Sequence, residues 1–304
     1  LVLVGAGSRY ENTQNNGIAH FLEHLFFEGG KRYRDTKAVS EALDRVGADF
    51  NAFTASEYVG YYVRLIAEKA ELAFDVLSDM LLYARLPEKE IKKERGVILE
   101  EYRMLNDTPV RKIGDLFENL IFAGSPMGFS TIGEPEVVQK LTREDFVAYR
   151  KRLYTPDNIV VIVAGEITPE RAAFLTQKFF PFKEGRKSLD SPLTQMPEKI
   201  GCRLLSKKTE QAHLILGTPA FPASDPRRYP LRVLATILGD GMSSRLFLKV
   251  REKHGLAYYI HTSEELYTDA GYLATAAGVE VERIELALKL ILEEYARVTQ
   301  ELVG

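Results

Sequence analysis

The sequence is poor in several features that mark particular classes of protein. It has one cysteine, Cys202, and no tryptophan among 304 residues. A single cysteine excludes an intramolecular disulfide, so hydrophobic cores must hold the fold together, and a chain without disulfides favours a cytoplasmic location. The longest apolar runs, such as residues 159–164, have only the length of a strand. We therefore expect no membrane span, because a spanning helix needs about 20 apolar residues.

An excess of either charge is also lacking. Forty Lys and Arg residues stand against 43 Asp and Glu residues, for a formal net charge of −3. Nucleic acid is therefore not expected as a partner, since a surface that binds it needs a surplus of basic residues. The hydrophobic fraction of 45% is typical of globular proteins, and a chain of this length is expected to form two domains.

The order of the predicted elements indicates an α+β fold with antiparallel sheets. Strand-like runs at 49–54, 58–66 and 158–164 lie among stretches of helical periodicity. The order glycine, strand, turn, strand, helix occurs at 47–70 and again at 255–287. As a sequence match this echo is weak, but the order of elements predicts a duplicated domain.

A stretch at 184–200 is rich in proline, lysine and serine and interrupts the periodicity, so we take it as a linker. It separates a predicted N-terminal domain, 1–183, from a predicted C-terminal domain, 201–304. The chain begins at Leu1, without a methionine and inside an apolar run. We therefore expect a fragment, and the sequence does not decide whether a signal or transit peptide precedes it.

The sharpest chemical feature lies on a helix predicted near the start of the chain. Asn15 or Asn16 can cap this helix, which runs through Phe27 and stops at the following pair of glycines. The helix carries the segment His-Phe-Leu-Glu-His at 20–24. Two of only five histidines fall in this segment, and its spacing is the inverted H-x-x-E-H signature of metallopeptidases.

The helical period explains why this spacing suits a metal. His20, Glu23 and His24 share one helix face about 100° wide, with the two imidazoles one turn apart. Both imidazoles can therefore bind one zinc ion, while the carboxylate lies beside the metal and can take a proton from a bound water.

A catalytic zinc needs a third protein ligand and an open position for water. A helix predicted at 87–106 offers Glu94 and Glu101, which lie on the same face because they are seven residues apart, whereas Glu100 points elsewhere. Alone, these two glutamates would be read as part of a solvated, charged helix face. Only a pairing with the histidines makes them candidates for the metal site.

With these residues the sequence resembles the pitrilysin, insulin-degrading enzyme and mitochondrial processing peptidase family of zinc metallopeptidases, over essentially the whole chain. In that family 76 residues separate the H-x-x-E-H signature from a glutamate ligand, and 76 residues lie between His24 and Glu101. The resemblance implies one zinc ion per chain, bound by His20, His24 and Glu101. It implies that Glu23 is the general base and that Glu94 is an auxiliary glutamate that orients the ligands.

Two further segments resemble elements of the family. One is the edge strand to which an extended peptide substrate adds as an extra strand; it comprises Asn51, Ala52, Phe53 and Thr54. The other is an Arg/Tyr element in the second domain, which Arg251 and Tyr258 match. These two side chains would hold the substrate and stabilise the oxyanion.

The resemblance also implies the fold and the activity. It implies two homologous domains of the LuxS/MPP-like metallohydrolase type, each an antiparallel sheet with helices on one face, the second domain being truncated. It implies a zinc metalloendopeptidase that cleaves peptides or unfolded protein segments, as a homodimer.

Two other functions are alternatives to a zinc endopeptidase. One is a non-catalytic scaffold or substrate-recognition subunit of a processing-peptidase-like complex. Such subunits usually lose zinc residues or divide the zinc motif and the Arg/Tyr element between chains, whereas this chain holds both. The other is a structural zinc site, which is disfavoured because three ligands beside an unbonded carboxylate are an open, catalytic arrangement.

Overall fold

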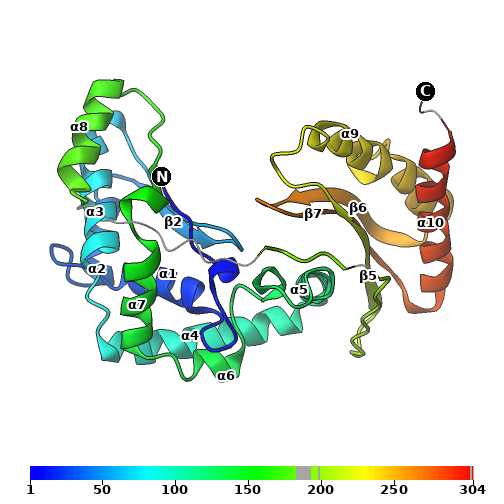
Figure 1. Ribbon diagram of the computed structural model, residues 1–304, viewed down its shortest axis with the longest axis horizontal. Coiled ribbons are helices and arrows are strands. Elements are labelled where there is room, and N and C mark those ends of the chain that lie inside the picture. The colour runs from blue at the N-terminus through cyan, green and yellow to red at the C-terminus, as the bar shows by residue number, and fades with distance from the viewer. Residues whose placement is uncertain (183–192, 198, 302, 304) are drawn as a thin grey trace. The chain divides into compact units, whose positions relative to one another are not determined.

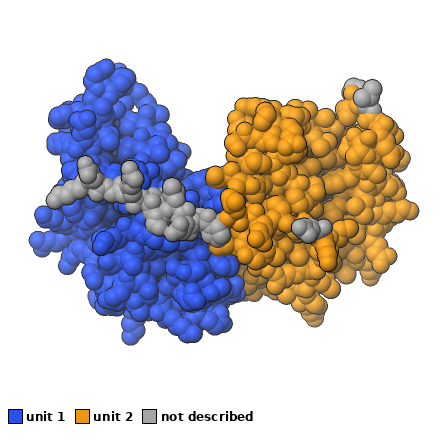
Figure 2. Space-filling model, viewed as in Figure 1, with its two compact units in different colours: residues 1–104, 129–192 blue, residues 105–128, 193–304 orange. Residues whose placement is uncertain are grey.

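The computed structural model describes residues 1–182, 193–197, 199–301 and 303. The chain divides into two compact units (Figure 2): unit 1 comprises 1–104 and 129–192, and unit 2 comprises 105–128 and 193–304. The predicted α+β class is confirmed, because each unit combines helices with an antiparallel sheet. The boundaries of the predicted domains stay a prediction, and most of the predicted linker lies outside the described residues.

Unit 1 is built on a four-stranded antiparallel sheet (Figure 1). Across the sheet, the strands are β2 (Asp49–Thr54), β3 (Val59–Arg64), β1 (Val2–Val4) and β4 (Ile159–Val161). Its helices are α1 (Ile18–Phe27), α2 (Thr36–Asp44), α3 (Ala70–Tyr83), α4 (Glu88–Asp107), α6 (Pro135–Val138), α7 (Arg143–Leu153) and α8 (Pro169–Phe179). The last residues of α4 belong to the stretch that is grouped with unit 2.

One face of this sheet is covered and the other is open. Successive side chains of a strand point to opposite faces. Tyr61 of β3 is fully buried and packs edge-on against Phe26 of α1, so its face meets the helices. On the opposite face, Val160 of β4 is 59% exposed. Helix α1 therefore covers the face of the sheet that carries Tyr61.

Unit 2 contains a three-stranded antiparallel sheet in the order β5 (Gln211–Ala220), β7 (Gly271–Glu280), β6 (Ala257–Leu266). Its helices are α5 (Pro109–Ile121), α9 (Arg228–Gly239) and α10 (Ile284–Gln300), with a π-helical segment at Phe247–Lys253. Leu238 of α9 and Ile291 of α10 are buried in one core with Ala277 of β7.

A second cluster joins α5 to the same sheet. Tyr272 of β7 packs edge-on against Phe117 of α5, and Gly217 of β5 has no room for a Cβ because that same phenylalanine ring occupies the space. Glu118 of α5 accepts hydrogen bonds from Tyr272 at 2.9 Å and from Tyr267 at 3.1 Å. These contacts explain why the stretch 105–128 is grouped with unit 2.

The predicted repetition of elements is visible in the two units. In unit 1, Gly47 precedes β2, β3 and α3; in unit 2, Gly255 precedes β6, β7 and α10. Both glycines have a positive φ, 65° and 56°, which a residue with a side chain adopts only at a cost. A 3₁₀ turn precedes both α3 and α10. In the part of the chain that the structure describes, no helix has both the length and the apolar character needed to cross a bilayer.

Candidate metal centre

Helix α1 presents two different faces. Its apolar residues, among them Phe21, Leu22 and Leu25, are fully buried in the core of unit 1. His20 and His24 project from another side, and their rings lie edge-to-face with centroids 4.8 Å apart. The burial of the apolar face fixes the rotation of the helix, so both imidazoles are held toward the same space.

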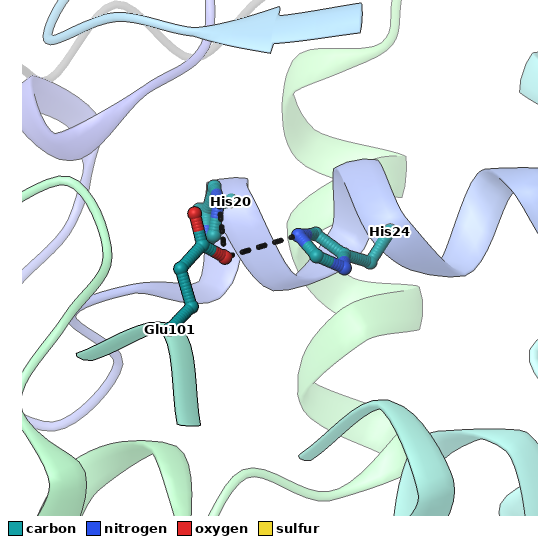
Figure 3. Close-up of side chains that lie close together, drawn as sticks. All are labelled: His20, His24 and Glu101. Carbon is teal, nitrogen blue, oxygen red and sulfur yellow. Dashed lines mark ion pairs between the residues drawn. The ribbon is translucent and has the colours of Figure 1, made fainter. Parts of the chain in front are cut away.

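Glu101 of α4 completes a group of three (Figure 3). Its Oε2 lies 3.7 Å from Nε2 of His20 and 3.7 Å from Nε2 of His24. These separations are too long for hydrogen bonds. The candidate ligand atoms of the three residues all lie within 4.8 Å of one another.

This donor set fits a zinc ion. Zinc bonds of about 2.0–2.1 Å place neighbouring ligand atoms of a tetrahedral site roughly 3.3–3.4 Å apart. The two nitrogen–oxygen separations of 3.7 Å are close to that spacing. Two imidazoles and one carboxylate are also a ligand set that catalytic zinc sites use.

Glu94 contacts the Nδ1 atom of His24, whereas Glu101 faces the Nε2 atom of the same ring. Oε2 of Glu94 lies 3.2 Å from Nδ1 of His24, and Glu94 is only 8% exposed. In the tautomer whose Nδ1 donates a hydrogen bond to this carboxylate, Nε2 carries no proton and its lone pair is free for a metal. Lys93 Nζ lies 3.2 Å from the other oxygen of Glu94 and 2.8 Å from Glu28, so it pairs with both carboxylates.

The two histidines differ in what holds them. Burial, followed by the neighbouring charge of His24, lowers the pKa of His20 to about 3, so its ring is neutral and able to ligate. Nδ1 of His20 is buried, and no described group forms a hydrogen bond with it. His20 therefore depends on its backbone for orientation, whereas His24 is oriented by Glu94.

Glu23 lies on the same helix but bonds elsewhere. Thr54 of β2 donates a short hydrogen bond to its carboxylate. Burial raises the pKa of Glu23, and the hydrogen bond from Thr54 opposes that rise. The carboxylate is thus held apart from the three ligands while the charges of His24 and Glu101 still act on it.

The strand β2 forms the outer edge of the sheet in unit 1. The hydrogen bond from Ala55 N–H to Tyr58 C=O sets the alternation of the β2–β3 ladder. By that alternation the N–H and C=O groups of Ala52 point to the free edge. Its N–H donates to the side-chain oxygen of Asn51 at 2.9 Å, and Phe53 packs beside Tyr58 on the far face.

Arg251 and Tyr258 lie in unit 2, on its two irregular segments. Arg251 belongs to the π-helical segment, and its guanidinium group is 4.9 Å from the centre of the Phe247 ring. Tyr258 is 75% exposed and sits where the β6–β7 register shifts. Such irregularities often re-aim side chains near functional sites, but a part for this pair at the metal centre stays a prediction.

The start of α1 differs from the prediction. Gly17, with a φ of 92°, is the N-cap, so the predicted caps Asn15 and Asn16 are wrong. Asn15 instead accepts a hydrogen bond from the backbone of Asn12, and Asn16 donates to Glu11. Both side chains therefore bond groups other than the first backbone N–H groups of the helix.

The sequence did not reveal two residues that contact this centre or its helix, Glu11 and Lys93, nor the contact that a third makes. Glu11 and Lys93 carried no signal, because their roles depend on which segments fold together. Thr54 was predicted to bind substrate, and its hydrogen bond to Glu23 was not foreseen. Of the predicted residues in unit 1, the structure brings together the three candidate ligands, with Glu94 beside His24.

Comparisons with known proteins bear on the whole chain. The family model described as Insulinase (Peptidase family M16) matches residues 1–134, and the model described as Peptidase M16 inactive domain matches residues 140–303. The zinc protease YmxG of Bacillus subtilis is 35% identical over 99% of this chain and 73% of its own length. A zinc protease of Streptomyces coelicolor is 36% identical over 97% of the chain, which spans 65% of that relative.

Solved structures show the same fold. A protease from Helicobacter pylori matches 100% of this chain and 75% of its own with a TM-score of 0.92 at 24% identity. A chain of complex III2 from Candida albicans matches 99% of this chain and 71% of its own with a TM-score of 0.86 at 16% identity. At these identities the likeness concerns the fold alone.

Proposed function

The chain belongs to peptidase family M16, the insulinase family of metallopeptidases, and from that premise we propose that it is a zinc-dependent endopeptidase. The observation that carries this proposal is the convergence of His20, His24 and Glu101 at a spacing suited to zinc. The relatives named zinc proteases support the same metal.

A zinc ion on these three residues would supply a Lewis acid, which acidifies a bound water and polarises a carbonyl. The protein's own groups do the rest. Glu23 would accept a proton from the water that attacks the scissile carbonyl. It would then return this proton to the amine that leaves when the C–N bond breaks. A carboxylate can serve in both steps, because it accepts the proton as the anion and gives it back as the acid.

Substrate binding is proposed at the edge of β2. An extended peptide would pair with the outward N–H and C=O of Ala52 as an added strand. The peptide carbonyl would then replace the side-chain oxygen of Asn51, which accepts the N–H of Ala52. Arg251 and Tyr258 are proposed to hold the peptide and stabilise the oxyanion. Peptides and unfolded protein segments are the expected substrates, because only an extended chain can pair in this way.

The scaffold alternative has less support. The likeness to a chain of complex III2 concerns the fold and says nothing of a shared role. Retention of all three ligands, the base and the auxiliary glutamate favours an enzyme. We further propose a homodimer and a cytoplasmic location, the latter supported by the single cysteine.

The experiment is peptide cleavage by the purified chain. An internally quenched peptide should be hydrolysed, a chelator should abolish the activity, and added zinc should restore it. Mass spectrometry of the products should show cleavage inside the peptide and not at its ends. Zinc-loaded protein that cleaves no peptide of a broad mixture would contradict the enzyme and favour the scaffold.

A further inference from the structure

We propose that Glu11 is a positioning residue of the metal centre, acting through the first turn of α1. It touches neither ligand nor substrate. Its carboxylate fixes where the helix begins, and through the helix backbone it fixes the direction of His20. This inference rests on the proposed function.

The carboxylate of Glu11 accepts hydrogen bonds at the start of α1. Its Oε2 accepts the N–H of Gly17 at 2.8 Å, and its Oε1 accepts the N–H of Ala19 at 2.9 Å. The side-chain amide of Asn16 donates to Oε2 at 2.9 Å. The residue is only 5% exposed. One buried carboxylate thus bonds three donors within four residues of the chain.

The helix needs this partner because it cannot cap itself. The first N–H groups of a helix have no partner within it. The N-cap Gly17 has no side chain, and a Cβ there would lie 2.7 Å from Gly133 Cα, so a serine or aspartate cap does not fit. A carboxylate from another segment satisfies the donors. Burial raises the pKa of Glu11 to about 7, and the hydrogen bonds from Ala19, Gly17 and Asn16 oppose that rise, as does the positive end of the helix dipole.

The effect on the metal centre falls on one ligand. His20 directly follows Ala19, whose N–H is bonded to Glu11. Because Nδ1 of His20 has no described partner, nothing beyond packing and the backbone aims its ring. His24 lies one turn further on and has Glu94. A first turn that frays or rotates would therefore displace His20 and leave His24 in place.

The test compares two helix caps. Glu11→Gln keeps the size of the side chain but replaces one acceptor oxygen with an NH₂ group, which cannot accept a backbone N–H. The matched control is Asp35→Asn, since the Asp35 carboxylate caps α2 by accepting the N–H of Ala38 and touches no ligand. For the full chain, the zinc dissociation constant would be measured by chelator competition, alongside the melting temperature without metal.

We expect Glu11→Gln to weaken zinc binding about tenfold or more, within the range known for residues that orient ligands. Asp35→Asn should leave zinc binding unchanged even where its melting temperature falls. Equal zinc affinity of Glu11→Gln and the parent, with a lower melting temperature alone, would overturn the inference and leave Glu11 a purely structural cap.

Glu11→Asp covers the case in which the glutamine variant does not fold. It keeps the charge but shortens the reach, so we expect a folded protein with zinc affinity between those of parent and glutamine variant. Parent-like affinity in the aspartate variant, together with a disturbed helix start, would also overturn the inference. A parent chain that binds no zinc would instead contradict the proposed function, so the two failures are distinguishable.

Discussion

The two units repeat one scaffold but differ in the helix that follows the first strand. In unit 1 this helix is α1, between β1 and β2; in unit 2 it is α9, between β5 and β6. Helix α1 carries two histidines and a glutamate beside its apolar face. Helix α9 buries Leu231, Ala235 and Leu238 and offers no ligand. Among the described residues, the candidate metal ligands thus occur in one copy of the fold only, because a site depends on a few side chains and not on the scaffold.

The polar groups inside the two units show the same difference. In unit 2, Thr262 of β6 bonds Thr275 of β7, which bonds Tyr295 of α10, with both distances 2.7 Å. These hydroxyl groups satisfy one another. In unit 1, the Nε2 atoms of His20 and His24 face a carboxylate at 3.7 Å, beyond hydrogen-bond distance. These partly exposed ligand atoms face one another without hydrogen bonds, an arrangement that a bound ion would satisfy.

The largest effect is expected from a substitution of the proposed base, which should lower peptidase activity and leave the bound zinc in place. Glu23→Gln should lower kcat by about 10²–10⁴-fold, the range for a general base, because the amide cannot accept the proton. Zinc content should not change, since Glu23 is not among the converging ligands. Initial rates with a quenched peptide and zinc analysis would be measured together. Full activity in this variant would refute the assignment of the base.

A substitution in the core of unit 2 should lower stability and leave zinc binding unchanged. Leu238→Ala removes a fully buried side chain from α9 and should lower the free energy of unfolding by about 2–5 kcal/mol. The zinc dissociation constant should stay at the parent value, because the ligands all belong to unit 1. Denaturant unfolding and chelator competition measure the two quantities. A large loss of zinc affinity would show that the units are not separable in function.

A smaller effect is expected from the auxiliary glutamate. Glu94→Gln should weaken zinc binding about 10–100-fold, the usual cost of losing a residue that orients a ligand, since the neutral amide holds Nδ1 of His24 less firmly. Glu90→Gln, on the same helix and near the same lysine, is the control. Equal zinc affinities in Glu94→Gln and Glu90→Gln would contradict the role of Glu94.

The smallest effect concerns the partner of the base. Thr54→Val should lower kcat about tenfold, because a hydrogen bond to a charged group contributes about 1.5–3 kcal/mol. KM should change little, and Thr54→Ser should restore the rate by replacing the donor. A rise in KM with unchanged kcat would instead favour a role for Thr54 in substrate binding alone.

Some of the site could be predicted because it depends on local geometry. The helical period places His20 and His24 on one face whatever surrounds the helix, and the heptad spacing does the same for Glu94 and Glu101. Glu11 could not be predicted, because its contacts depend on a loop that folds back to the helix start. The wrong caps have the same cause: Gly17 is required by the close approach of Gly133, which no local pattern reveals.

The fold shows the same division between local and distant causes. The antiparallel strands and the repeated order of elements follow from periodicity and glycine positions. The grouping of α5 with unit 2 does not, since it depends on Phe117 fitting against the glycine of a strand about 100 residues later. Contacts between segments so far apart in the chain leave no periodic trace in either segment.

The most direct test of the metal centre is the zinc content of extensively dialysed protein. Parent, Glu101→Gln and Glu100→Gln would be compared, since Glu100 is the adjacent residue and pairs with Arg103 on the surface. We expect about one zinc per chain in the parent and in Glu100→Gln, and clearly less in Glu101→Gln. Equal zinc in all three proteins, or none in a folded parent, would contradict a centre built from His20, His24 and Glu101.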